Sequence, residues 1–332
     1  MGGEDLQLAL HICYGLHYDG FDAVPDQWEW DPSLLALRSR LEDRFLIDMI
    51  SGATMDGPRS DESGQGPAIV ARVHEMLQRP LGPSLSRFME EQGTEDHLRE
   101  FVIHRSVYQR KEADAHTWAI PRLRGRAKSA FVTLQVDEYG NGLAGRAHAD
   151  LFATTMDALD LDPTPGAYID QVPGVTLATD NLVSLLGLHR RWRGALVGHL
   201  SAFEMTSVLP MSRYAAAIRR LIDEEAAAEF YDVHVAADVR HAKIAAEELI
   251  IGLAESDPEA AGDIESGVAA LLAVERRFSD HLLTSWASGA SSLFTAPAER
   301  SVEPPAPDGL SFLRVLGLDE APADTGSCMA AG

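Results

Sequence analysis

The sequence predicts an all-α fold, and three observations carry that prediction. Alanine and leucine are abundant, whereas aromatic residues make up only 7% of the chain, a composition that favours helices. Apolar side chains recur at spacings of three and four residues from about residue 68 to residue 293. Alternating strand patterns are short and rare, and the best of them, 130–136, is still interpreted as helix. The predicted architecture is a helical bundle with an N-terminal helical extension.

The segment 1–67 is expected to be an accessory region in front of the bundle. One or two helices flank a tryptophan-rich turn at 28–32, and Asp31 or Ser33 can cap the helix that follows this turn. Residues 51–67 are rich in Gly, Ser, Asp and Pro, which predicts a loop or linker. The accessory region therefore consists of helices followed by a linker.

The main helical domain is expected to span 68–294, and a proline-rich tail without fixed structure is expected at 295–332. Within the domain, the glycines on either side of Asn141 break or kink the chain. Three prolines and two glycines predict a loop at 160–176. The expected helices cover residues 68–77, 98–115, 124–138, 148–156, 177–189, 192–207, 213–225, 230–253 and 257–286.

The charge balance excludes several classes of partner. The chain has 51 Asp and Glu against 28 Lys and Arg, which disfavours binding to nucleic acid and to anionic membranes. The negative charge favours solubility, and it is also compatible with a cationic substrate such as an amine. No apolar run approaches the ~20 residues of a membrane span, and the N-terminus does not resemble a signal peptide. With two cysteines, Cys13 and Cys328, and no CxxC pair, we expect a cytoplasmic protein without a disulfide framework.

Three polar residues, His234, Asp238 and His241, lie within an otherwise apolar helical segment. Their spacing of four and three residues places all three on one face of a helix. Two imidazoles and a carboxylate suit a divalent transition metal such as iron. A solvated polar face is the alternative, but alanine, valine and isoleucine surround the three residues, and buried His and Asp need partners. From these residues alone, metal ligation and a structural role both remain open.

Further candidate ligands lie in other helices. Glu204 is the only Asp, Glu, Lys or Arg between residues 195 and 211, so it must be neutral, paired or bound to a metal. Glu138 and His148 lie ten residues apart, close to three helical turns, so both can face inward if the break between them is only a kink. Glu112 is placed on the preceding helix, although the basic residues beside it also suit a surface position.

The order of these residues resembles the ligand pattern of the heme-oxygenase-like diiron oxidase and oxygenase superfamily. That family has a Glu, a Glu-x9-His pair, a lone Glu and a terminal His-x3-Asp-x2-His, in this order. The match covers roughly residues 95–255 and fills every ligand position. The matching residues are Glu112, Glu138, His148, Glu204, His234, Asp238 and His241.

This resemblance implies a haem-oxygenase-like bundle that holds two iron ions in place of haem. Dioxygen would be the co-substrate, and an external donor would supply electrons. Similar enzymes oxygenate an amine nitrogen towards hydroxylamine and nitro products, whereas others desaturate or fragment amino or fatty acids. The expected function is therefore N-oxygenation of an amino acid or similar small metabolite in a biosynthetic pathway, with C–C or C–H oxidation as the alternative. No catalytic residue beyond the metal ligands is assigned.

Several points stay open at the level of sequence. A non-catalytic helical metal-binding protein is a further alternative. Arg213 and Arg240 are candidates for anchoring a substrate carboxylate, although a surface role suits both. No flavin or dinucleotide fingerprint is present, so the reductant is expected to be external. Dimerisation through the N-terminal helices is compatible with the sequence, which carries no direct signal for it.

Overall fold

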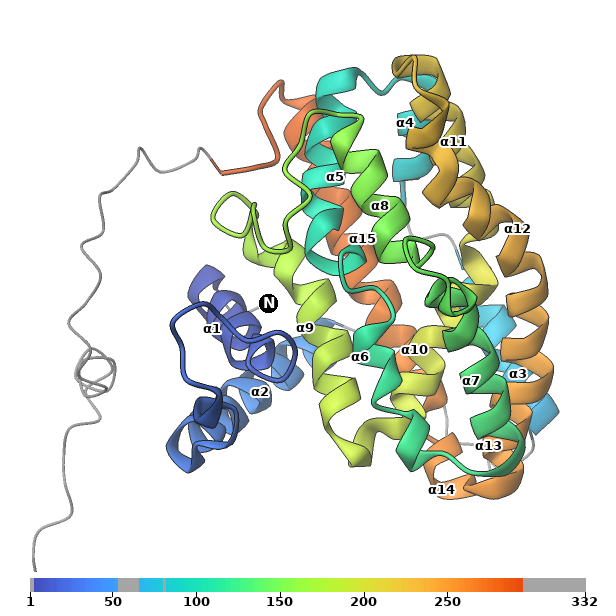
Figure 1. Ribbon diagram of the computed structural model, residues 1–332. Helices are drawn as coiled ribbons and strands as arrows, with labels where there is room; N and C mark the ends of the chain where they lie inside the picture. The colour runs from blue at the N-terminus through green and yellow to red at the C-terminus, as the bar shows by residue number, and fades with distance from the viewer. Residues whose placement is uncertain (1–2, 53–65, 80–81, 295–332) are drawn as a thin grey trace, which may run out of the picture. The chain divides into compact units, whose positions relative to one another are not determined.

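The computed structural model describes residues 3–52, 66–79 and 82–294, and every regular element in these ranges is helical (Figure 1). The all-α prediction is therefore confirmed. The predicted linker at 51–67 lies mostly outside the described residues, and the predicted tail at 295–332 lies wholly outside them. Among the described helices, none combines the length and apolar character that crossing a bilayer requires.

The helices occupy almost all of the segments in which the sequence predicts them, with shifted ends. The α-helices are α1 (Glu4–Gly15), α2 (Pro32–Gly52), α3 (Gly66–Leu77), α4 (Leu85–Glu91), α5 (Glu95–Gln109), α6 (Asp114–Thr117), α7 (Gly125–Glu138), α8 (His148–Asp157), α9 (Gly174–Leu188), α10 (Arg193–Thr206), α11 (Val208–Leu221), α12 (Glu229–Lys243), α13 (Ile251–Ser256), α14 (Pro258–Ala261) and α15 (Ile264–Ala287). Short 3-10 turns are η1 (Asp26–Trp30), η2 (Ile120–Arg122), η3 (Gly140–Gly142), η4 (Arg190–Trp192) and η5 (Glu225–Ala228), and η6 (Ile244–Ile250) is a π-helix.

The N-terminal helices form as predicted: α1 packs against α9 (Figure 1), and α2 contacts α1 and α15. Asp31 caps α2, because its Oδ1 accepts hydrogen bonds from the backbone amides of Ser33 and Leu34. The contact of α1 with α9 is partly polar and buried: Asn181 Nδ2 donates to the side-chain and backbone oxygens of Gln7, each at 2.8 Å. Buried polar groups that are satisfied across the contact fix the register of α1 on α9.

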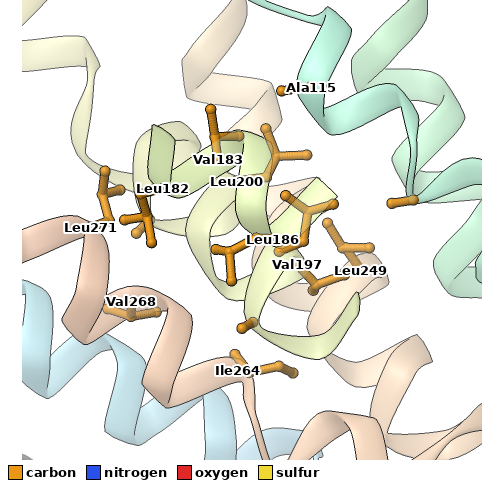
Figure 2. Close-up of a cluster of buried hydrophobic side chains, with 14 of the residues drawn as sticks. Ala115, Leu182, Val183, Leu186, Val197, Leu200, Leu249, Ile264, Val268 and Leu271 are labelled. Carbon is orange, nitrogen blue, oxygen red and sulfur yellow. The ribbon is translucent and has the colours of Figure 1, made fainter. Parts of the chain in front are cut away.

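The hydrophobic core lies where α9, α10 and α15 meet, with η6 beside them (Figure 2). Leucine, alanine and valine side chains at helical spacing supply most of it, as the apolar periodicity predicts. Burial of these side chains is what stabilises the bundle against the entropy of the unfolded chain. The core residues labelled in Figure 2 are Ala115, Leu182, Val183, Leu186, Val197, Leu200, Leu249, Ile264, Val268 and Leu271.

Glycines allow α10 and α15 to approach each other closely. A Cβ added at Gly198 would overlap the backbone carbonyl of Ile264, and one at Gly267 would overlap that of Ala195. We expect Gly198→Ala to destabilise the protein by about 1–3 kcal/mol, because the backbones of two packed helices must separate. Urea unfolding followed by circular dichroism measures this change. Gly262→Ala, where the added Cβ would lie 3.3 Å from its nearest neighbour, is the control and should have a far smaller effect.

Candidate metal centre

Helix α12 presents His234, Asp238 and His241 on one buried face, as their spacing predicts. Their exposed fractions are 5%, 1% and 0%. The opposite face of the helix reaches solvent at Val239, which is 67% exposed. An apolar residue is thus outside while three titratable residues are inside, which is the reverse of what a solvated polar face would show. The three residues belong to a site inside the bundle.

Glu138 and His148 lie at facing ends of two separate helices, α7 and α8. Of the two alternatives that the glycines allow, a break or a kink, the chain takes the break, a loop between two helices. Gly140 at φ +62° and Asn141 at φ 56° turn the chain through left-handed conformations, and a side chain at Gly140 would overlap the backbone of Arg146. The loop nevertheless brings His148 Nδ1 to 2.7 Å from Glu138 Oε2.

Glu112 lies in a turn between α5 and α6, not on a helix. The predicted helix through Ala115 is wrong at this end, because α5 ends at Gln109. In the turn that follows, the Arg110 guanidinium donates to the carbonyls of Ala149 and Pro163. The turn carries Glu112 Oε1 to 3.6 Å from His234 Nε2. This residue is therefore part of the site rather than of the surface.

Glu204 from α10 completes the set on the other side of Glu138. Its Oε2 lies 3.1 Å from His241 Nδ1, and Asp238 Oδ1 lies 3.3 Å from the same nitrogen. A lone carboxylate in an apolar helix was expected to be neutral, paired or metal-bound, and it stands within reach of an imidazole and a second carboxylate.

The candidate ligands form two clusters that have Glu138 in common. Within each cluster, one potential ligand atom from every residue lies within 4.8 Å of the others. A carboxylate that belongs to both clusters is in the position to bridge two metal ions. The first cluster contains Glu112, Glu138, His148 and His234, and the second contains Glu138, Glu204 and His241 with Asp238 adjacent to it.

Unsatisfied polar atoms in the clusters fit a bound divalent metal. Four buried atoms have no hydrogen-bond partner: Glu112 Oε2, Glu138 Oε2, His148 Nδ1 and Asp238 Oδ1. Although His148 Nδ1 and Glu138 Oε2 are 2.7 Å apart, they do not form a hydrogen bond, which is consistent with lone pairs directed at a common point. Buried polar atoms normally have partners, and mixed imidazole and carboxylate ligands suit iron.

The outer nitrogens of two imidazoles are fixed by hydrogen bonds. His234 Nδ1 donates to the Phe230 carbonyl at 2.7 Å, and His241 Nε2 donates to Asp137 Oδ2 at 2.8 Å. The other nitrogen of each ring then faces the cluster and can offer its lone pair to a metal. Ser207 Oγ likewise donates to Asp238 Oδ2 at 2.5 Å. Hydrogen bonds to the outer atoms of these side chains thus fix the direction in which their inner atoms point.

Charge interactions within the clusters shift several pKa values. Burial raises the pKa of Glu204, and the charge of Glu138 adds to this effect. Burial also opposes ionisation of Glu138, but the neighbouring His148 outweighs it and lowers the pKa of Glu138. The pKa of His234 is raised to about 10 and that of His241 to about 11, since adjacent carboxylates outweigh burial. Without metal, the clusters hold protons that a metal would displace.

Sequence reasoning missed the residues that support the ligands. Asp137 and Ser207 carry no sequence signal of their own, since each becomes relevant only when another helix packs beside it. Of the two arginines proposed as substrate anchors, Arg240 pairs with Asp137 and is 61% exposed. Arg213 contacts Glu90 at 3.4 Å. Neither arginine lines the cavity next to the clusters.

We expect Asp137→Asn to weaken metal binding at the second cluster by roughly 10–100-fold, the range typical of a group that orients a ligand. The amide removes the charge that holds the His241 ring, while the first cluster keeps its ligands. Anaerobic titration with ferrous ion, with iron counted per chain, would show one site weakened. Arg240→Gln removes the other partner of Asp137 and is the control. Equal loss at both clusters in the aspartate variant would contradict this prediction.

A small cavity of about 40 Å³ adjoins both clusters. This space is large enough to admit at least one molecule of the size of water. One wall is formed by ligands and the other by apolar side chains. The lining residues are Tyr108, Glu112, His116, Gln135, Glu138, Leu200, Phe203, Glu204, Ser207, Met211, His234 and Asp238.

Comparisons with known proteins agree with this geometry. A family described as "Iron-containing redox enzyme" matches residues 99–276, which include all seven candidate ligands. A segment of 132 residues is 25% identical to the nitrosourea synthase of Streptomyces achromogenes subsp. streptozoticus. That segment spans 40% of this chain but only 28% of the synthase.

Solved structures with a similar backbone have low sequence identity. A CADD-like protein of unknown function from Nostoc punctiforme PCC 73102 is 14% identical with a TM-score of 0.50, over 68% of this chain and 96% of that one. A domain of unknown function with a heme oxygenase-like fold from Shewanella denitrificans OS217 is also 14% identical, with a TM-score of 0.45, over 69% of this chain and 95% of that one. At such identity, the first likeness concerns the fold alone.

Proposed function

Because this chain belongs to the family of iron-containing redox enzymes, we propose that it is a non-haem diiron oxygenase that uses dioxygen to N-oxygenate a small amine. The substrate would be an amino acid or similar metabolite of a biosynthetic pathway, and the product a hydroxylamine or nitro compound. Electrons would come from an external donor. The named relative, a nitrosourea synthase, supports chemistry at nitrogen.

One observation carries the proposal: two buried clusters of metal-ligating side chains share the carboxylate of Glu138. Iron ions bound in both clusters would supply the electrons with which dioxygen is activated. The ligand set would hold them through Glu112, His148 and His234 on one side of Glu138, and through Glu204, Asp238 and His241 on the other.

The remaining residues of the cavity support dioxygen chemistry on a small substrate. The space beside the clusters is about 40 Å³, which suits a diatomic molecule. Tyr108, Phe203 and Leu200 line it together with the carboxylates, so apolar side chains lie beside the ligands.

The apolar lining favours one alternative. Tyr108, Leu200, Phe203 and Met211 can contact hydrocarbon, so a diiron oxidase that desaturates or fragments an amino or fatty acid is the second candidate. Both functions use the same clusters and differ in which substrate atom is presented to them.

A labelling experiment tests the proposal. The metal-free chain is loaded anaerobically with ferrous ion, and isotopically labelled dioxygen, a reductant and a panel of amino acids and amines are then added. We expect product masses that include labelled oxygen bound to nitrogen. Products that are alkenes or shortened carbon chains would favour the alternative and reject N-oxygenation. Glu138→Gln is the inactive comparison, and Glu91→Gln, which changes a carboxylate of an exposed ion pair with Arg87, is the matched control.

A further inference from the structure

A second cavity, of about 220 Å³, lies at the far end of α7 from the metal centre. Arg124 at its rim directly precedes α7, whose last residue is the ligand Glu138. The helix has 14 residues, so its two ends are ~20 Å apart. This cavity is therefore separate from the clusters. Its lining residues are Arg122, Leu123, Arg124, Arg190, Arg193, Leu253, Ser256 and Asp257.

The cavity concentrates positive charge on a chain whose formal net charge is −23. Four arginines line it and only one carboxylate, Asp257, does so. That carboxylate is already engaged, since its Oδ2 accepts hydrogen bonds from Nε and Nη2 of Arg193 at 2.8 and 2.5 Å. The charges of the other three guanidinium groups are thus not balanced by any carboxylate that lines the cavity.

The arginines are held close together rather than spread apart. Arg122 is anchored, because its guanidinium donates to the carbonyls of Gly187 and Leu188 at the end of α9. Burial lowers the pKa of Arg122, and the charge of Arg190 lowers it further, which reflects the proximity of the two cations. Arg124 and Arg190 are exposed and can reach a solute that enters the cavity. Like charges brought together in this way repel one another unless an anion lies between them.

Two helix amino termini add to the positive potential. The cavity is lined by residues at the start of α7 and of α10, each of which has 14 residues. Neither helix has a side-chain cap at its N-terminus, although the first amide of α10, that of Arg193, donates to the carbonyl of Arg190. Gly125, the first residue of α7, has φ +51° and no atom within 4 Å of where a Cβ would lie, so the backbone here is open to approach. Such ends favour phosphate groups.

We infer that this arginine-lined cavity binds a small phosphate-bearing anion with at least two negative charges. Guanidinium groups bind phosphate oxygens through paired hydrogen bonds, and the anchored Arg122 presents its group in a fixed direction. The volume exceeds what a single phosphate needs and admits a diphosphate or a phosphorylated metabolite. The inference does not depend on the proposed oxygenase activity, since the cavity shares no residue with the metal clusters.

Calorimetric titration of the metal-free full chain with pyrophosphate, at ionic strength held constant with chloride, tests the inference. We expect saturable binding to one site. The double variant Arg124→Gln/Arg190→Gln should raise the Kd at least roughly ten-fold, because two charged hydrogen-bond donors are lost. Arg122 and the Arg193–Asp257 pair remain in this variant, so the cavity keeps its shape.

The matched control is Arg87→Gln/Arg276→Gln, which removes the same charge from arginines that are 63% exposed and lie outside the cavity. Its Kd should be unchanged. Absence of saturable binding, or an equal loss of affinity in both double variants, would overturn the inference, since the attraction would then be non-specific. Citrate that binds as tightly as pyrophosphate would overturn the assignment to phosphate. Anaerobic ferrous titration of separate aliquots of the same proteins separates any failure here from a failure of the metal centre.

Discussion

Glu138→Gln is expected to abolish iron binding at both clusters and to reduce oxygenation by more than ~100-fold, beyond the range for a residue that only supports a ligand. The glutamine has nearly the same shape but lacks the charge with which one carboxylate can hold two cations. Iron per chain after anaerobic dialysis, measured beside turnover, reports both effects.

Substitutions of ligands that belong to only one cluster test whether Glu138 serves both. His148→Ala should empty only the first cluster, and His241→Ala only the second, so each should retain part of the iron. Glu265→Gln, a carboxylate that is 37% exposed and pairs with Arg72, should keep all of it. If Glu138→Gln lost no more iron than either histidine variant, Glu138 would not be shared between two metals.

Phe230→Ala is expected to destabilise the protein by about 3–5 kcal/mol, the usual cost of emptying a fully buried aromatic site. The ring is completely buried, and its centroid lies 5.1 Å from that of Phe152 and 4.5 Å from that of His234. Its loss removes packing from the side of α12 that carries the ligands. Urea unfolding of the metal-free protein gives the stability change, and ferrous titration shows whether the first cluster weakens with it.

Phe230→Leu is the graded comparison and should cost much less, since most of the volume remains. The exposed Phe294, at 46%, provides a control at which truncation to alanine should change stability little. A metal-free stability in Phe230→Ala close to that of the unsubstituted chain would mean that the ring does not support α12.

The haem-oxygenase-like, all-helical architecture and the family could be predicted from the sequence. The structure buries the polar side chains of α12 and Glu204, as the sequence pattern predicts, for one physical reason. In both places, polar side chains interrupt helices that are otherwise apolar, and periodicity fixes which face they share. The resemblance in ligand order then linked residues far apart in the chain, and the family match confirms that resemblance.

Other features depend on tertiary contacts that the sequence does not express. Glu112 was expected on a helix, but α5 ends early where Arg110 bonds to distant carbonyls. Asp137 points towards His241 only because η6, the continuation of α12, packs beside α7. The buried pair of His116 and His199, whose ring nitrogens are 3.0 Å apart, requires two helices to be rotated correctly. Rotation about a helix axis is set by packing, not by periodicity alone.

The π-helix η6 follows the last ligand on α12 and separates a segment that carries ligands from one that packs in the core. A π-turn accommodates one residue more than an α-turn, so the residues before and after it are offset by about 100°. Upstream, that orientation directs His241 into the centre; downstream, Leu253 and Ala254 face the core. A continuous α-helix would have to favour either the ligands or the core. The wider π-turn lets the segments before and after it differ in their rotation about the helix axis.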